Sequence, residues 1–160
     1  MHHETSGSVG NYERHLDRAL DLMKKFDYPA AKTGYVGKII PRGEFHDGQA
    51  MVNHFNFVAR RFADNKLMVN SHECSHPTGY SRTYPNYIAA ESARGNEFNA
   101  WSNGNPPAHE TILPFTRQLG GPMDYTPGIF EIKMSYYDKN KTEQVHTTLA
   151  KQLALYVTMY

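Results

Sequence analysis

Two acidic side chains and a histidine lie at the ends of short apolar segments of the chain, and a third acidic side chain lies in a following loop. Residues 67–69 form an apolar run with the length of a buried strand, and it ends directly in a polar cluster that contains His72 and Glu73. Glu91 and Glu97 follow soon after. A carboxylate and an imidazole at the mouth of a buried strand occupy the place where barrel and other α/β enzymes keep their chemistry.

The segments around these residues alternate between two kinds of hydrophobic pattern. Apolar residues at helical spacing predict helices over residues 12–26, 48–64, 111–119 and 142–160. On the last of these, Val145, Leu149, Leu153 and Tyr156 are expected on one face. Short apolar runs predict strands that begin near residues 30, 67, 87 and 123.

Strands that are mostly separated by helices indicate a parallel sheet with right-handed crossovers. We therefore predict an α/β fold, part of a (β/α)8 TIM barrel cut in mid-pattern. A small flavodoxin-like sheet is the rival interpretation, but it requires a first strand that the sequence lacks. The polar opening His2-His3-Glu4 is expected where an absent strand would have ended, so the chain is expected to be a piece of a longer protein.

Composition narrows the class of protein. The 160 residues are 39% hydrophobic and 21% charged with a net charge of +1, which is ordinary for one globular domain. No basic run favours nucleic acid, and no apolar stretch approaches the length of a membrane span. Neither a signal peptide nor a disulfide framework is expected, and we interpret the lone Cys74 as a packing residue.

Residues that close different parallel strands converge on one rim. This rim is expected to hold Thr33-Gly34-Tyr35, Asp124-Tyr125, the glutamates Glu4, Glu73, Glu91 and Glu97, and His2, His72 and Lys32 among them. Clustered carboxylates repel one another unless a cation is bound. Oxygen ligands suit Ca²⁺, whereas carboxylates with histidines also suit zinc. The alternatives are a metal- or sugar-binding module without turnover, or surface glutamates that pair with Arg82 or Arg94.

The sequence closely resembles the catalytic barrel of glycoside hydrolase family 97, the Bacteroidetes family of α-glucosidases and α-galactosidases. The resemblance runs over essentially the whole chain, in the strings HHETSGSVGNYERHLDRA, KTGYVGKIIPRGE, HDGQAMVNH, MVNSHE, RTYPNYIAAESARGNE, ILPFTRQLGGPMDYTPGIFE and QLALYVTMY. It implies a longer parent enzyme, exported to the periplasm, with an N-terminal β-sandwich, the first barrel strands and a C-terminal β-domain that this chain does not contain.

The resemblance also implies roles for individual residues. Glu4 and Glu73 match the bases that activate water, and Glu97 matches the general acid. Glu73, Glu91 and Glu97 match ligands of Ca²⁺. His2, His72 and Lys32 match residues that line the sugar subsite, so an oligosaccharide is the expected substrate.

Three positions bear on the type of reaction and on the sugar. Gly34 stands where retaining α-galactosidases of the family have an aspartate nucleophile, so the resemblance implies an inverting α-glucosidase. In an inverting enzyme the two carboxyl groups stand roughly 6.5–9.5 Å apart, which leaves room for water. Phe45 and His76 replace the expected histidine and arginine, and both differences can alter sugar contacts.

Overall fold

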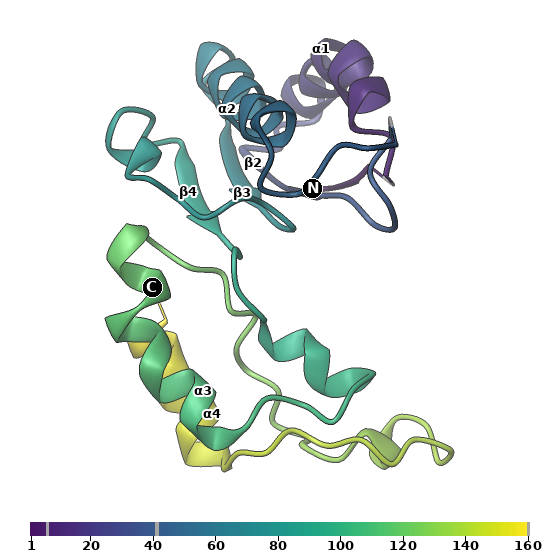
Figure 1. Cartoon of the computed structure of the whole chain (residues 1–160), viewed down its shortest axis with the longest axis vertical. Helices are drawn as coiled ribbons and strands as arrows, with labels where there is room; N and C mark the ends of the chain where they lie inside the picture. Colours follow the sequence, from purple (N-terminus) through teal and green to yellow (C-terminus); the bar gives the residue numbers. More distant parts are fainter. Residues whose placement is uncertain (6, 41, 160) are drawn as a thin grey trace. The chain divides into compact units, whose positions relative to one another are not determined.

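The computed structural model describes residues 1–5, 7–40 and 42–159. The chain divides into two compact units, Met1–Ser92 and Ala93–Tyr160 (Figure 1). In the described residues, no helix combines the length and the apolar character needed to cross a membrane.

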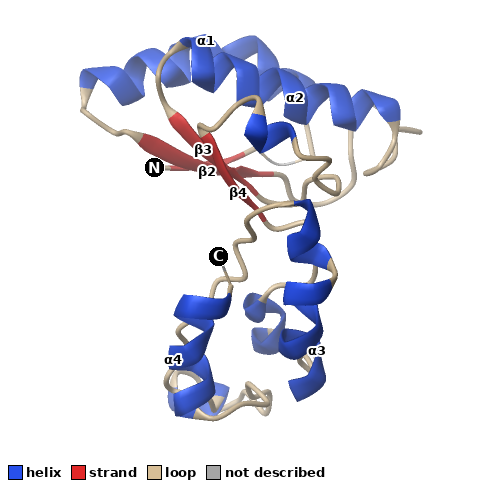
Figure 2. Ribbon diagram, turned by 90° about the vertical axis from the view of Figure 1, so that its left-hand side faces the viewer, coloured by secondary structure: helices blue, strands red, loops and turns tan. Residues whose placement is uncertain are grey.

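The first unit is a four-stranded parallel sheet covered by helices. Its elements are β1 (His2–Glu4), α1 (Val9–Lys25), β2 (Ala30–Gly34), α2 (Gln49–Asp64), β3 (Met68–Ser71), the short 3-10 helix η1 (Tyr80–Arg82) and β4 (Tyr87–Ala90). The strands lie in sequence order and all pairs are parallel. Figure 2 shows α1 and α2 over one face of this sheet. The predicted parallel α/β architecture is confirmed in this unit.

The helices and the sheet meet through the apolar stripes that the sequence predicts. Leu16, Leu20 and Met23 of α1 are completely buried, and α2 contributes Val58 and Phe62. Both helices begin and end close to the predicted residues. Arg61 near the end of α2 binds Asp17 of α1, which adds a polar contact at the exposed edge of the helix pair.

A short strand precedes the first helix, where the sequence predicted none. β1 exists, and it pairs with β2 through the register His2↔Lys32, His3↔Thr33 and Glu4↔Gly34. A three-residue strand made of His-His-Glu has no apolar alternation, so its sequence carried no strand pattern. Pairing with the neighbouring strand defines it instead, and His3 packs its ring near Tyr12 and Phe62 of the helices.

The second unit consists of short helices and irregular segments. It contains the helices α3 (Pro107–Ile112) and α4 (Leu149–Thr158) and the 3-10 turns η2 (Asn96–Ala100), η3 (Leu113–Phe115), η4 (Arg117–Gly120) and η5 (Met134–Tyr136). The helix expected over 111–119 therefore begins earlier and breaks into 3-10 turns. Pro114 lacks the amide hydrogen that a continuous α-helix needs there.

The strand expected from residue 123 does not form in the described part of the chain. Tyr125, which was expected at the rim, is completely buried in the core of the second unit. Its carbonyl accepts a hydrogen bond from the amide of Asn96, and its hydroxyl donates to Glu110. Thr126 then takes a left-handed φ of 52°. The backbone of this segment is therefore bonded to the loop that contains Asn96, within the second unit, and forms no strand.

The last helix is shorter than expected, and of the four residues expected on one face Val145 is buried but precedes the helix. It begins at Leu149, and its predicted end, Tyr160, lies outside the described residues. Leu149, Leu153 and Tyr156 are all more than half exposed, whereas Gln152 and Leu155 are buried. The Oε1 atom of Gln152 accepts hydrogen bonds from Asn96 and from the amides of Gly128 and Ile129. The inward face of α4 thus combines this polar contact with the apolar packing of Leu155.

Candidate active site

The face of the sheet opposite α1 and α2 carries a row of polar residues at the carboxyl ends of the strands. The register places Glu4 beside Gly34. Thr33 pairs with Ser71 and Ser71 with Ala90, so His72 and Glu91 follow one residue beyond the paired positions. The amides of His72 and Glu91 continue the pairing, because they donate to the carbonyls of Thr33 and Ser71. Glu4, Gly34, His72 and Glu91 thus cross the sheet as one row.

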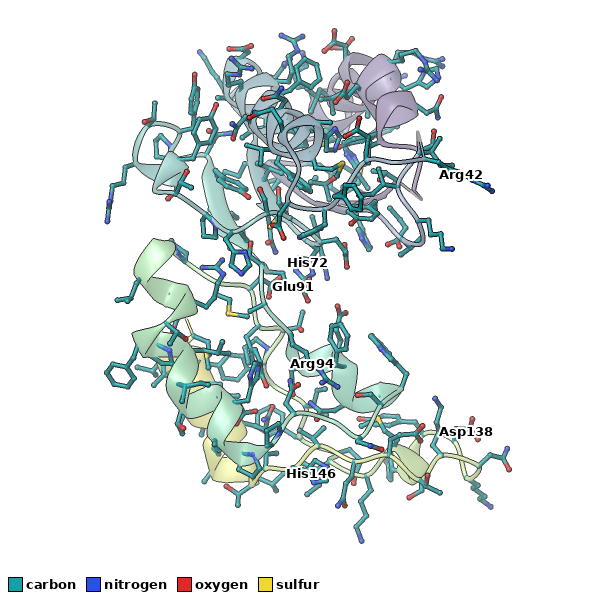
Figure 3. The ribbon with its side chains drawn as sticks, in the orientation of Figure 1. Arg42, His72, Glu91, Arg94, Asp138 and His146 are labelled. Atoms are coloured by element: carbon teal, nitrogen blue, oxygen red, sulfur yellow. The ribbon has the colours of Figure 1, made fainter. Side chains whose placement is uncertain are left out.

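His72 and Glu91 form the buried centre of this row. Their side chains are only 2% and 7% exposed, and His72 Nδ1 lies 3.5 Å from Glu91 Oε2. Figure 3 shows the two residues next to each other at the ends of their strands. A carboxylate that is buried beside an imidazole is not a solvated surface group. The interpretation of Glu91 as a surface residue is therefore wrong.

Glu73 extends the row from a strained backbone position. It has a left-handed φ of 47°, and Ser92, two residues beyond β4 as Glu73 is beyond β3, has a φ of 48°. For residues other than glycine such conformations cost of order 1–3 kcal/mol, and they cluster at functional sites. The Glu73 amide donates to Glu91 Oε2 over 3.4 Å. The strained turn therefore directs the Glu73 carboxylate to a position that it would not reach if the extended backbone of β3 continued.

Gly34 leaves the space into which the Glu73 carboxylate projects. A Cβ atom at position 34 would lie 2.2 Å from Glu73 Oε2 and 3.1 Å from the Cβ of His72. Gly34 has an ordinary φ, so close approach and not backbone conformation requires glycine here. No side chain of any kind fits at position 34 while Glu73 keeps this position.

Cys74 and Ser92 join the two turns that follow β3 and β4. The buried Cys74 thiol donates to the carbonyl of Ser71 and lies 2.9 Å from the Ser92 hydroxyl. The Ser92 hydroxyl in turn donates to the Ser75 carbonyl. The packing role expected for Cys74 agrees with this burial, and the contacts fix the turn that carries Glu73.

A second support comes from the loop that follows β2. His46 Nε2 lies 3.0 Å from the carbonyl of Cys74, and His46 Nδ1 lies 3.0 Å from the Tyr35 hydroxyl. With the Nε2 proton donated to the carbonyl, Nδ1 accepts from Tyr35. Burial, followed by the negative charges of Glu73 and Asp47, raises the pKa of Tyr35, so its phenol stays a hydrogen-bond donor. This role of His46 is not apparent from the sequence, because the residue lies in a loop with no periodic pattern.

Three further predicted site residues, His2, Glu4 and Lys32, lie on β1 and β2 and on the same face of the sheet as His72 and Glu91. His2 and Lys32 pair in the register, and Lys32 also pairs with Asn70. His2 Nε2 lies 3.0 Å from Glu4 Oε2, with both side chains about half exposed. This contact lets His2 orient the Glu4 carboxylate while water still reaches it.

Glu97 belongs to the second unit, in the first turn of η2. The residue before it, Asn96, is completely buried, and its side-chain amide donates to Gln152 and to the carbonyl of Thr126. The position of Glu97 within its own unit is thus anchored by its neighbour. The structure brings His72, Glu73 and Glu91 together in the first unit, with His2, Glu4 and Lys32 on the same sheet face.

The donor set of the first unit fits a divalent cation. His72, Glu73 and Glu91 each offer a ligand atom, and these atoms lie within 4.8 Å of one another. Carboxylate oxygens suit Ca²⁺, and the addition of an imidazole nitrogen is also compatible with zinc. Two acidic groups this close require a positive partner or a shared proton. A metal ion therefore suits the chemistry of these residues.

Comparisons with known proteins place this arrangement in a family. The model of the family described as Glycoside hydrolase 97 matches residues 1–93. The curated Retaining alpha-galactosidase of Bacteroides thetaiotaomicron is 37% identical over 108 residues, which are 64% of this chain and 16% of that protein.

Two solved structures of a Glycoside Hydrolase Family 97 enzyme from Pseudoalteromonas sp. strain K8 are similar over 99% of this chain and 26% of theirs. One is a complex with panose at 45% identity and the other a complex with acarbose at 46% identity, each with a TM-score of 0.86. This chain thus spans about a quarter of the length of these solved relatives. The predicted partial TIM barrel is confirmed by this likeness. Because the family model matches more than half of the chain, the chain belongs to glycoside hydrolase family 97.

Proposed function

We propose that the enzyme containing this chain is a calcium-dependent, inverting α-glucosidase that acts on oligosaccharides. The observation that carries the proposal is the contact at Gly34. Glycine offers no nucleophile at that position, and the Glu73 carboxylate occupies the space in its place, with Oε2 only 2.2 Å from where a Cβ atom would lie. The site therefore favours water, activated by a carboxylate, over an enzymic nucleophile.

In the proposed reaction, water attacks the anomeric carbon as the glycosidic bond breaks. Glu73 and Glu4 act as the bases that remove the proton from this water, and Glu97 donates a proton to the departing oxygen. His2, paired with Glu4 over 3.0 Å, keeps that carboxylate oriented. His72 and Lys32 bind hydroxyl groups of the sugar ring from the same sheet face.

The proposed cation is Ca²⁺, held by Glu73, Glu91 and Glu97. When bound, it supplies positive charge that offsets the mutual repulsion of the carboxylates and polarises substrate hydroxyls. Family resemblance supports this ligand set, and the proximity of His72, Glu73 and Glu91 supports it within the first unit. Export to the periplasm is proposed on the same resemblance.

The stereochemistry of the first product tests the proposal. Proton NMR during hydrolysis of an α-linked glucoside by the full-length enzyme should show the β-anomer of glucose first, before mutarotation. Initial release of the α-anomer would contradict inversion. Glu97→Gln should reduce turnover by about 100-fold or more, as expected when a general acid is removed. Unchanged activity in that variant would favour a binding role for the carboxylates.

A retaining α-galactosidase is the second candidate, because the curated relative from Bacteroides thetaiotaomicron carries that name. Gly34 weighs against it, since no carboxylate is available at that position. The same NMR measurement with an α-galactoside separates the two candidates. Faster hydrolysis of the galactoside with release of the α-anomer would establish the second candidate and overturn the first.

A further inference from the structure

The loop between β2 and α2 contains an open cleft of about 520 Å³ within the first unit. Its lining includes Tyr35, Lys38, Arg42, Glu44, Phe45 and His46. Clefts of about 300–1,000 Å³ are typical of small-molecule sites. We call it the 35–46 cleft.

The 35–46 cleft begins beside the candidate active site. Tyr35 directly follows Gly34, and His46 binds the carbonyl of Cys74, the residue after Glu73. The cleft extends outward from there, because Figure 3 shows Arg42 at the side of the first unit, away from His72 and Glu91. A chain of sugar rings leaving the active site on this side would pass over Tyr35 and His46 first.

The side chains of the cleft match the chemistry of a neutral sugar. Phe45 is 75% exposed, and its backbone is fixed by a turn in which the amide of Gly48 donates to the Phe45 carbonyl at the start of α2. An exposed aromatic ring offers a flat apolar surface for the C–H groups of a sugar ring. The Lys38 and Arg42 side chains can donate hydrogen bonds to sugar hydroxyls, and the Glu44 carboxylate can accept them. Charges of both signs favour a polyhydroxylated ligand over an anion.

We propose that the 35–46 cleft binds the sugar ring on the leaving-group side of the scissile bond, with Phe45 as its stacking surface. The inference rests on the proposed function. If the enzyme removes a terminal glucose, every further ring of the substrate lies on the leaving-group side. The solved relatives hold panose and acarbose, which contain several rings, so a related enzyme must accommodate more than one.

The test compares two substrates in the full-length enzyme. Maltotriose places sugar rings in the leaving group, whereas α-glucosyl fluoride has the same reacting ring and no leaving sugar. The measured quantity is the kcat/KM for maltotriose divided by the kcat/KM for α-glucosyl fluoride. Phe45→Leu should lower this ratio by about tenfold, which is near the lower end of the effects seen when one apolar contact in a pocket is lost. Phe45→Tyr keeps an aromatic face and should keep the ratio. Arg42→Ala should lower the ratio in the same direction by removing a donor.

The control is Phe26→Leu, which removes an exposed aromatic ring of the first unit outside the cleft and should leave the ratio unchanged. Equal kcat/KM losses for both substrates in Phe45→Leu, or no loss, would overturn the cleft assignment. Failure of the proposed function gives a different result, because the wild-type enzyme would then hydrolyse neither glucoside. If it hydrolyses galactosides instead, the same ratio is measured with raffinose and α-galactosyl fluoride.

Discussion

At the scale of single residues, Gly34 leaves room for the Glu73 carboxylate beside the end of β2. Replacement by alanine places a methyl group 2.2 Å from Glu73 Oε2 and 3.1 Å from the Cβ of His72. The Glu73 carboxylate is flexible and can move away, so we expect the unfolding free energy to change by no more than about 1 kcal/mol. Displacement of the proposed base should lower kcat by about 100-fold. Steady-state kinetics and chemical denaturation of Gly34→Ala measure both.

Gly10 provides the matched control for this substitution. It lies in α1, where an added Cβ would meet only Arg14 Nη1 at 4.0 Å. Gly10→Ala should leave kcat unchanged and stabilise the helix by about 0.5–1 kcal/mol. Full activity of Gly34→Ala would contradict the role given to the contact between Gly34 and Glu73.

Single residues also show how far the sequence could predict this site. His72, Glu73 and Glu91 were found because residues that follow parallel strands meet at one edge of a sheet. The role of His46 was not predictable, because its contacts with Tyr35 and Cys74 depend on how a loop folds back. The sequence also gave no sign of the left-handed turn at Glu73.

At the scale of elements, the packing of α1 against α2 contains a titratable contact. His54 of α2 is buried, and its Nδ1 lies 2.8 Å from Glu13 Oε1 of α1, with Tyr12 nearby. Burial lowers the pKa of His54 below its usual 6.5, and the contact with Glu13 opposes this shift only in part. The unfolded chain therefore binds a proton more readily than the folded chain. The stabilisation is complete above pH 6.5 and is lost as the pH falls below it.

We expect the unfolding free energy to fall between pH 7 and pH 5, and to fall less in His54→Gln, which can still donate to Glu13. Burial also lowers the pKa of His3 and adds a slope of the same sign, so the difference between wild type and variant isolates His54. Urea denaturation at a series of pH values measures it. His15→Gln, at an exposed site of α1, is the control and should retain the wild-type slope. An identical slope in His54→Gln would refute the assignment.

Within the second unit, Glu110 holds α3 against α4. Its buried side chain accepts from the Tyr125 hydroxyl and forms an ion pair with Lys151, where Nζ lies 2.8 Å from Oε2. Glu110→Ala would leave both partners without their carboxylate. Breaking a buried pair costs about 3–5 kcal/mol, and we expect the lower end because Lys151 is partly exposed. Thermal unfolding measures the loss, and Glu143→Ala, which removes a partly exposed carboxylate, should cost less than about 1 kcal/mol.

Elements differed in how well their sequences predicted them. The positions of α1 and α2 were predictable from their clear apolar stripes, since both helices pack against the apolar face of the sheet. β1 is not apparent from its own sequence, because the neighbouring strand defines it. The buried face of α4 is not apparent either, because it includes Gln152, a polar residue. Periodicity reports apolar burial and carries no information about such polar contacts.

At the scale of the whole molecule, parallel topology was predictable because alternating strands and helices permit few arrangements. The second unit was not predicted as well, because its backbone is bonded to side chains such as those of Asn96 and Gln152 and not to strands. The expected domain organisation of the longer parent remains a prediction.

Removal of metal tests whether a cation at the cluster of His72, Glu73 and Glu91 stabilises the whole molecule. If Ca²⁺ binds the folded enzyme and not the unfolded chain, as proposed, a concentration 100 times the Kd should add about 2.7 kcal/mol to the unfolding free energy. EGTA should therefore lower both the Tm and the activity of the full-length enzyme, and added Ca²⁺ should restore them. Glu91→Gln should lose most of this response, because it removes a proposed ligand charge at a buried position. Glu131→Gln, in the second unit and outside the cluster, should keep it. Recovery with zinc but not with Ca²⁺ would instead assign His72 as a ligand of a transition metal, because imidazole nitrogen suits zinc better than Ca²⁺.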